Sequence, residues 1–149
     1  MKKLIFGLIA VVMLSISGNA QTEKPVAELI DGKPVMIVDK EVLLKNWNAN
    51  LEKYSGIIGE FTNIEIIEAD GNYYLSASGK IYKSSTILEL AKAGSNLLVA
   101  TGITCTTRDC ATIAGCLPNS RKTACSDCGY NGDCTKTVSS LSVVDSIQD

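Results

Sequence analysis

Six cysteines are the residues in this chain whose type and spacing could do chemistry. They are Cys105, Cys110, Cys116, Cys125, Cys128 and Cys134. The residues between them are mainly Gly, Pro, Asn, Asp, Ser and Thr, so this segment has too little apolar surface to offset the entropy of its own ordering. We therefore expect disulfides that join all six cysteines, in a pairing that the spacing does not select.

Two of these cysteines also have the spacing of a metal knuckle. Cys125 and Cys128 are separated by two residues and followed by Gly129, which is similar to the knuckle of zinc ribbons and rubredoxins. The second such pair that a zinc ribbon requires is missing, and the chain has no histidine to replace it. A metal-binding or thiol-redox protein that uses Cys125 and Cys128 is therefore the alternative hypothesis, and no cofactor is expected.

The absence of histidine also removes most catalytic arrangements. Ser-His-Asp and Cys-His sites and histidine-containing zinc sites are excluded, which leaves paired carboxylates as the catalytic groups that this sequence could supply. Glu65 with Glu68, or Asp127 with Asp133, could form such a pair. Glu65 alternates with apolar neighbours as a solvent-facing strand residue does, and the two aspartates lie among turn residues. The sequence thus favours a protein without catalytic activity.

Four tyrosines could instead provide a binding platform for a sugar or a protein. They are Tyr73, Tyr74, Tyr82 and Tyr130. Adjacent residues of a strand point to opposite faces, so we expect at least one of Tyr73 and Tyr74 to face solvent. Tyrosine is also common in strands for packing reasons, so ordinary positions in the core or on the surface are the simpler interpretation.

The first 20 residues are typical of a cleavable secretory signal. Lys2 and Lys3 precede an apolar run of 11 residues, Leu4–Leu14, which is shorter than the ~20 residues of a membrane-spanning helix. We expect cleavage after Ala20 and a chain without membrane attachment in the periplasm or outside the cell. Loss of the two lysines changes the net charge from −2 to −4, which disfavours nucleic acid as a partner.

The following segment predicts a hairpin and then a helix. Residues 27–30 and 35–38 flank Asp31-Gly32, a dipeptide suited to a two-residue turn, and Pro34 places its strand at a sheet edge. Asp39 can cap a helix that ends before Gly56. Its apolar positions recur at helical spacing and predict a core-facing stripe. These positions are Leu43, Leu44, Trp47, Leu51 and Tyr54.

Four further strands are expected after this helix. Residues 61–67 and 73–77 flank Asp70-Gly71, and residues 87–91 and 97–100 flank a second turn, although residues 86–93 could also form a short helix. The pattern predicts an α+β fold in which one amphipathic helix packs on a small antiparallel sheet, followed by a disulfide-rich irregular C-terminal segment. The expected division is a signal peptide at 1–20, an α+β domain at 21–104, a cysteine-rich segment at 105–134 and a polar tail at 135–149.

This order of features resembles small exported bacterial proteins of unassigned function with a C-terminal cysteine cluster. The resemblance rests on the signal peptide, the helix at 39–54, the strands and the Cys-x4-Cys, Gly-Cys-x-Pro and Cys-x2-Cys spacings. It implies an exported location. Together with the missing catalytic motifs, it predicts a disulfide-stabilised, non-enzymatic binding protein whose partner lies outside the cytoplasm.

Overall fold

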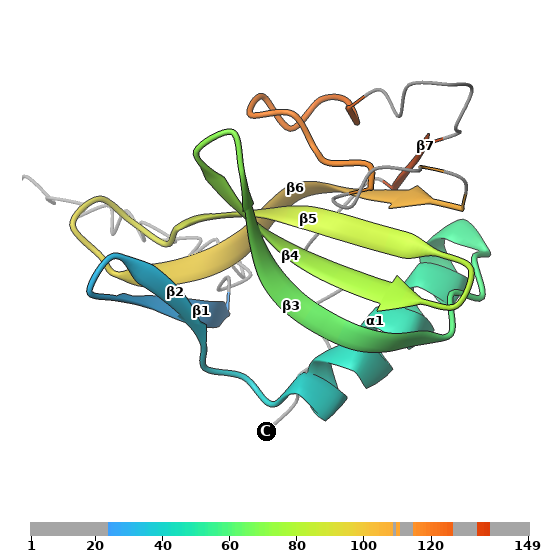
Figure 1. Ribbon diagram of the computed structural model, residues 1–149, viewed down its shortest axis with the longest axis horizontal. Coiled ribbons are helices and arrows are strands. Elements are labelled where there is room, and N and C mark those ends of the chain that lie inside the picture. Colours follow the sequence, from blue (N-terminus) through green and yellow to red (C-terminus); the bar gives the residue numbers. More distant parts are fainter. Residues whose placement is uncertain (1–23, 109, 111–114, 127–133, 138–149) are drawn as a thin grey trace, which may run out of the picture.

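The computed structural model describes residues 24–108, 110, 115–126 and 134–137. Within them the fold is α+β and mostly β, with one helix and an antiparallel sheet (Figure 1). The elements are β1 (Pro25–Ile30), β2 (Lys33–Met36), α1 (Lys40–Ser55), β3 (Phe61–Ala69), β4 (Asn72–Gly79), β5 (Lys83–Leu90), β6 (Leu97–Thr107) and β7 (Cys134–Thr137). The predicted signal peptide lies outside the described residues.

The sheet curls until its two end strands meet. Its order is β2-β1-β6-β5-β4-β3, and β2 also contacts β3, so the sheet is nearly barrel-shaped (Figure 1). The long strand β6 is central to this arrangement. Along one edge it pairs with β5, whereas its other edge pairs first with β1, at 97–99, and then with β7, at 104–107.

Both Asp-Gly pairs form the turns expected of them. Asp31 and Gly32 have φ angles of 51° and 75°, and Asp70 and Gly71 have φ angles of 50° and 75°. Two consecutive residues with positive φ define the tight turn that matches the twist of a hairpin. These turns join β1 to β2 and β3 to β4, and β2, which contains Pro34, lies at the end of the strand order.

The helix begins and ends where the sequence predicts. The Asp39 carboxylate accepts hydrogen bonds from the backbone N–H groups of Glu41 and Val42, at 2.9 and 3.0 Å. Gly56 is left-handed, with φ 69°, and its N–H donates to the Glu52 carbonyl. A Gly in this conformation ends a helix at no steric cost.

One face of the helix packs into the curled sheet. Leu43, Trp47 and Leu51 are at most 2% exposed and belong to the main core, which confirms their predicted positions. Tyr54 is 60% exposed, so its inclusion in the core-facing stripe was wrong. Its ring lies within 5.0 Å of the Lys53 ammonium at the last turn of the helix.

A side-chain amide fixes the helix against the start of β3. Asn48 donates a hydrogen bond to the Phe61 carbonyl at 3.0 Å and accepts one from the Phe61 N–H at 2.8 Å. The helix is therefore held to the sheet by polar contacts as well as by its apolar face.

The cysteine region departs most from expectation. It is not irregular throughout, because Cys105 lies inside β6 and Cys134 begins β7. The sheet is therefore larger than predicted, and the expected domain boundary at residue 105 falls within a continuous strand. The alternative short helix at residues 86–93 does not form, since β5 extends to Leu90.

Candidate functional site

The loop of residues 115–126 forms a small hairpin of its own on the outer face of the sheet. Pro118 and Cys125 form an isolated β-bridge, and the Ser126 N–H donates to the Leu117 carbonyl at 2.6 Å. Inside the loop, the Asn119 side-chain oxygen accepts hydrogen bonds from the N–H groups of Thr123 and Ala124, at 2.9 and 3.3 Å. We call these residues the stapled loop, because two disulfides attach them to strands.

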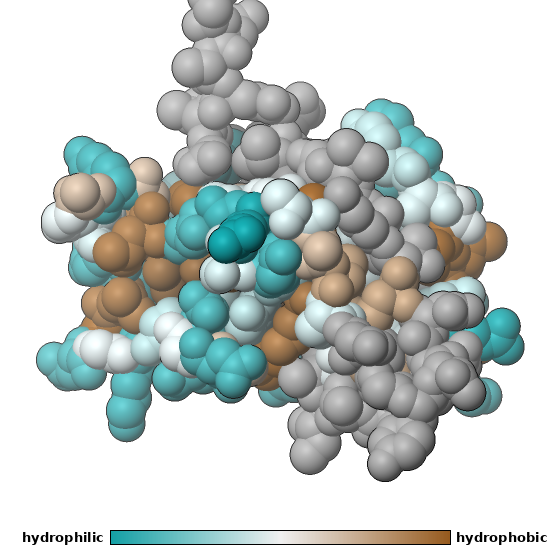
Figure 2. Space-filling view, turned by 90° about the horizontal axis from the view of Figure 1, so that it is seen from above, coloured by the Kyte–Doolittle hydropathy of each residue, from teal (hydrophilic) through white to brown (hydrophobic). Residues whose placement is uncertain are grey.

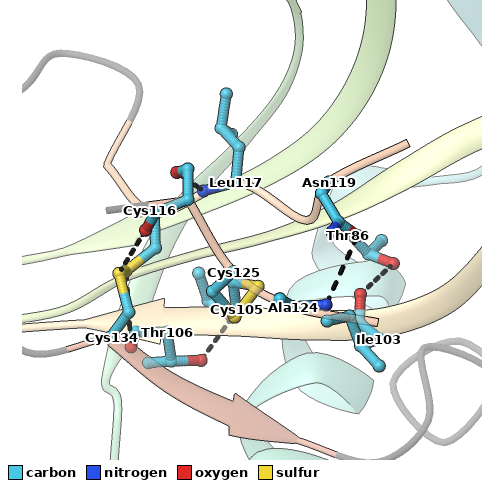
Figure 3. The surroundings of a disulfide bond; sticks show 12 residues. Thr86, Ile103, Cys105, Thr106, Cys116, Leu117, Asn119, Ala124, Cys125 and Cys134 are labelled. Carbon is cyan, nitrogen blue, oxygen red and sulfur yellow. Dashed lines mark hydrogen bonds between the residues drawn. A yellow bond between two sulfur atoms is a disulfide. The ribbon is translucent and has the colours of Figure 1, made fainter. Parts of the chain in front are cut away.

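The two disulfides join this loop to neighbouring strands (Figure 3). Cys105 of β6 bonds to Cys125, with their Cα atoms 5.7 Å apart, and Cys116 bonds to Cys134 of β7, with their Cα atoms 6.0 Å apart. Both separations are ordinary for disulfides. Cys105 and Cys116 are at most 1% exposed and pack with Ile103 in a second apolar cluster, separate from the main core. Cys110 belongs to the same cluster and is also disulfide-bonded.

An ion pair gives the loop a third attachment. The Lys122 ammonium contacts the Glu89 carboxylate of β5, and this carboxylate also accepts a hydrogen bond from the Thr101 hydroxyl at 3.1 Å. Lys122 has a φ of 58°, a conformation that L side chains rarely adopt. A Cβ at Gly102 would lie 2.5 Å from the Lys122 Cβ, so the loop approaches β6 at a position where only glycine fits.

A hollow of about 580 Å³ lies between the stapled loop and the turn that joins β3 to β4. From the hairpin it is lined by Ala69, Asp70, Asn72 and Tyr74. From the loop it is lined by Gly115, Leu117, Pro118, Asn119, Ser120 and Ser126. Its volume is within the usual range for small-molecule sites. The face on which the loop lies mixes teal, white and tan residues at its centre, and the larger brown areas lie toward its ends (Figure 2).

The lining combines polar and apolar groups and carries little charge. Asp70 is the one charged residue among the described residues that line the hollow, and it is solvent-exposed. Burial raises the pKa of the Tyr74 phenol, and the negative charge of Asp70 raises it further, while a hydrogen bond with Asn72 opposes the shift. The phenol therefore remains protonated at neutral pH and can donate a hydrogen bond.

The alternative of a tyrosine platform finds no support among the three tyrosines of this set that the structure describes. Tyr73 packs against the main core, and Tyr74 is 4% exposed and pairs with Ile87 on the outer face, so the two rings lie on opposite faces. Tyr74 is buried, whereas Tyr73 is half-buried and its hydroxyl forms a surface hydrogen bond with the Gly32 carbonyl, so the expectation that one of them faces solvent holds only for the Tyr73 hydroxyl. Tyr82 is half-buried against the core, and Tyr130 lies outside the described residues.

Of the two candidate carboxylate pairs, the one that the structure describes is not brought together as a site. Glu65 and Glu68 are both exposed on β3, and a separation of three residues places them on opposite faces of the strand. Asp127 and Asp133 lie outside the described residues. Glu65 is the solvent-facing strand residue that its alternation with isoleucine predicts.

In the Cys-x-x-Cys motif, Cys125 is bonded to a residue outside the motif. Cys125 bonds to Cys105, 20 residues earlier, and its sulfur is therefore not a thiolate that could bind a metal ion. Cys128 lies outside the described residues. Among the residues that the structure does describe, no group of three or more His, Cys, Asp or Glu side chains is placed to hold a metal ion.

Sequence reasoning missed the hollow. Asp70 was identified only as a turn residue, and Asn72, Leu117 and Ser120 carried no signal. These residues come together through the pairing of Cys105 with Cys125, which the cysteine spacing did not select.

Comparisons with known proteins do not extend this description. No protein family, no curated protein and no solved structure matches the chain. Of the residues that the structure describes, none form a helix with the length and apolar character needed to cross a membrane.

Proposed function

We propose that the protein is an exported, disulfide-stabilised binding protein without catalytic activity, and that it takes up its ligand in the hollow beside the stapled loop. The observation that carries this proposal is the construction of the hollow. One wall is a tight two-residue hairpin turn, and the other is a loop attached to the sheet by two disulfides and an ion pair.

The attachments favour binding because they reduce the entropy lost when a ligand orders its site. A free loop of this composition would lose that entropy at each binding event, whereas a cross-linked loop has lost most of it during folding. The hydrogen bonds of Asn119 within the loop also order it before a ligand binds. A fixed loop on a sheet scaffold is also the usual place for recognition residues.

The disulfides support export, together with the apolar N-terminal run. Disulfides persist in oxidising compartments and are rare in the reducing cytosol. The bridges of Cys105 with Cys125 and of Cys116 with Cys134 therefore fit a protein that acts in the periplasm or outside the cell.

Export is tested by fractionation and intact mass. The full chain is expressed in a bacterial host, and its N-terminus and mass are determined in each fraction, with and without reduction. We expect an N-terminus at Gln21 and a mass lower by six hydrogens than that of the reduced form, since the chain has six cysteines. Cytoplasmic protein that keeps Met1 and has free thiols would overturn the proposal.

Binding in the hollow is tested with a pair of matched tryptophan variants. Ser120→Trp places a large ring in the hollow, whereas Thr62→Trp places the same ring at an exposed position of β3 that does not line it. Oxidised wild-type protein and both variants are used to capture small molecules from culture medium and cell-surface extract, which are then identified by mass spectrometry. A compound retained by the wild type and Thr62→Trp but lost from Ser120→Trp supports the proposal. Equal recovery from all three proteins contradicts it.

A further inference from the structure

The hollow carries a charge pattern that narrows the class of ligand. Its described lining contains one carboxylate, that of Asp70, and no lysine or arginine. The stapled loop has two cationic residues outside this lining: Lys122 contacts Glu89, and Arg121 is exposed next to Ser120. Anionic ligands such as phosphates and carboxylates are bound through cationic groups or arrays of N–H donors, so the lining opposes this class.

The polar groups of the lining are matched to hydroxyl groups. The Asp70 carboxylate is an acceptor only, the protonated Tyr74 phenol can donate, and the Ser120 hydroxyl can do both. A hydroxyl group also donates and accepts, so it can satisfy either kind of partner. The Ser126 hydroxyl accepts from the Leu117 N–H at 2.9 Å and keeps its own proton available for donation.

Apolar surface accompanies these polar groups. Leu117 and Pro118 line the loop side of the hollow, and Ala69 lines the hairpin side. A sugar ring presents C–H groups on its faces and hydroxyl groups around its edge, so it can contact both kinds of surface at once. The volume of about 580 Å³ accommodates a ligand of one or two sugar rings.

From these observations we infer that the hollow binds a neutral saccharide. This inference rests on the proposed binding function and specifies its ligand class. A protonated amine is the main competitor, because it would pair with Asp70. That carboxylate is exposed, however, and an ion pair between exposed groups contributes little, so charge alone would not hold an amine there.

The inference is tested by titrating the oxidised, full mature chain with neutral saccharides. The probes are glucose, galactose, mannose, N-acetylglucosamine, maltose and lactose, and the readout is the amide NMR spectrum. We expect at least one probe to produce saturable shifts confined to residues 69–74 and 115–126. Shifts that are absent, unsaturable or located elsewhere for every saccharide overturn the inference.

Two aspartates in the same type of turn provide a matched control. Asp70→Asn removes the charge but keeps a residue that tolerates positive φ, and Asp31→Asn makes the same change in the turn between β1 and β2. We expect Asp70→Asn to weaken saccharide binding about threefold, since an exposed acceptor contributes modestly, and Asp31→Asn to leave it unchanged. Equal effects of the two substitutions contradict a role for Asp70.

A second set of probes separates this inference from the proposed function. Putrescine and the methyl ester of lysine supply amines, and a neutral tripeptide supplies amide groups. If these compounds shift the same amides and saccharides do not, the saccharide inference fails and the binding function stands. If none of the probes binds and Ser120→Trp captures the same compounds as the wild type, both fail.

Discussion

The Tyr73 phenol donates a hydrogen bond to the Gly32 carbonyl at 3.1 Å, and this bond connects β4 to the turn between β1 and β2. The two residues are 41 positions apart in sequence. Two strands, β6 and β5, separate β1 from β4 in the sheet order, so the contact crosses the curl instead of running along a strand pair. It therefore reports on whether the sheet is closed.

Tyr73→Phe removes this bond and keeps the ring in the core. Because the bond lies near the surface, we expect the free energy of unfolding to fall by about 0.5–1 kcal/mol, measured from urea denaturation. Tyr54→Phe is the control, since Tyr54 is 60% exposed, and it should change stability by less than about 0.5 kcal/mol. Equal stability of the two variants would mean that the Tyr73 bond does not contribute to closing the sheet.

Gly102→Ala tests the close approach of the stapled loop to β6. Gly102 and Gly32 both have a φ of 75°, so alanine costs each about 1–2 kcal/mol in backbone strain. Of these two glycines, Gly102 is the one at which the new Cβ meets a described residue, Lys122, whereas no described residue lies within 4 Å of a Cβ at Gly32. We expect the unfolding free energy of Gly102→Ala to be at least about 1 kcal/mol lower than that of Gly32→Ala. A difference near zero would show that the loop does not lie against β6.

Removal of the disulfide between Cys105 and Cys125 should release the loop before it unfolds the domain. The double variant Cys105→Ala, Cys125→Ala loses a bridge that spans 20 residues, which corresponds to about 3 kcal/mol of stability. We also expect faster tryptic cleavage after Arg121, an exposed residue of the loop. Emission from the buried Trp47 reports separately on the core and should remain that of the native protein. Unchanged cleavage would contradict an attachment through this bridge.

The raised pKa of the Tyr74 phenol predicts that the protein loses stability at alkaline pH. Its pKa in the folded chain is raised above the ordinary value of 10.0, mainly by burial, so the unfolded chain releases the proton first as the pH rises. The stability that the protonated Tyr74 phenol contributes is fully present below about pH 10, and it is lost as the pH rises through the pKa of the folded chain. We expect the urea midpoint of unfolding to be lower at about pH 11 than at about pH 8.

Tyr74→Phe should show a smaller fall over the same interval, because its side chain does not titrate. Tyr54→Phe serves as the exposed control, and its urea midpoint should fall as much as that of the wild type. If the urea midpoint of Tyr74→Phe falls by the same amount as that of the wild type, the Tyr74 phenol is not buried in the folded protein.

Local signals in the sequence were sufficient for much of the fold. Asp31-Gly32 and Asp70-Gly71 predicted their turns because few dipeptides accept two positive φ angles. Asp39 and Gly56 predicted the ends of the helix because a side-chain acceptor is needed at one end and a left-handed residue at the other. Each of these features depends on residues close together in the chain.

The cysteine region could not be predicted in the same way. Cys105 reads as part of a polar, cross-linked segment, but it lies in β6 because β5 and β7 pair with that stretch from either side. Tyr74, which is 4% exposed, lines the hollow together with a loop more than 40 residues later in the chain. Contacts at this separation depend on which sulfurs join, and no local pattern encodes that choice.

Strand β6 also constrains the order of assembly. The first strand of the described fold pairs with residues 97–99, so the hairpin of β1 and β2 has no paired sheet neighbour until about sixty further residues are available. The same strand then accepts β7 along its remaining edge. From this topology we expect a late folding step in which distant segments pair with β6, and strand edges that stay unpaired until that step.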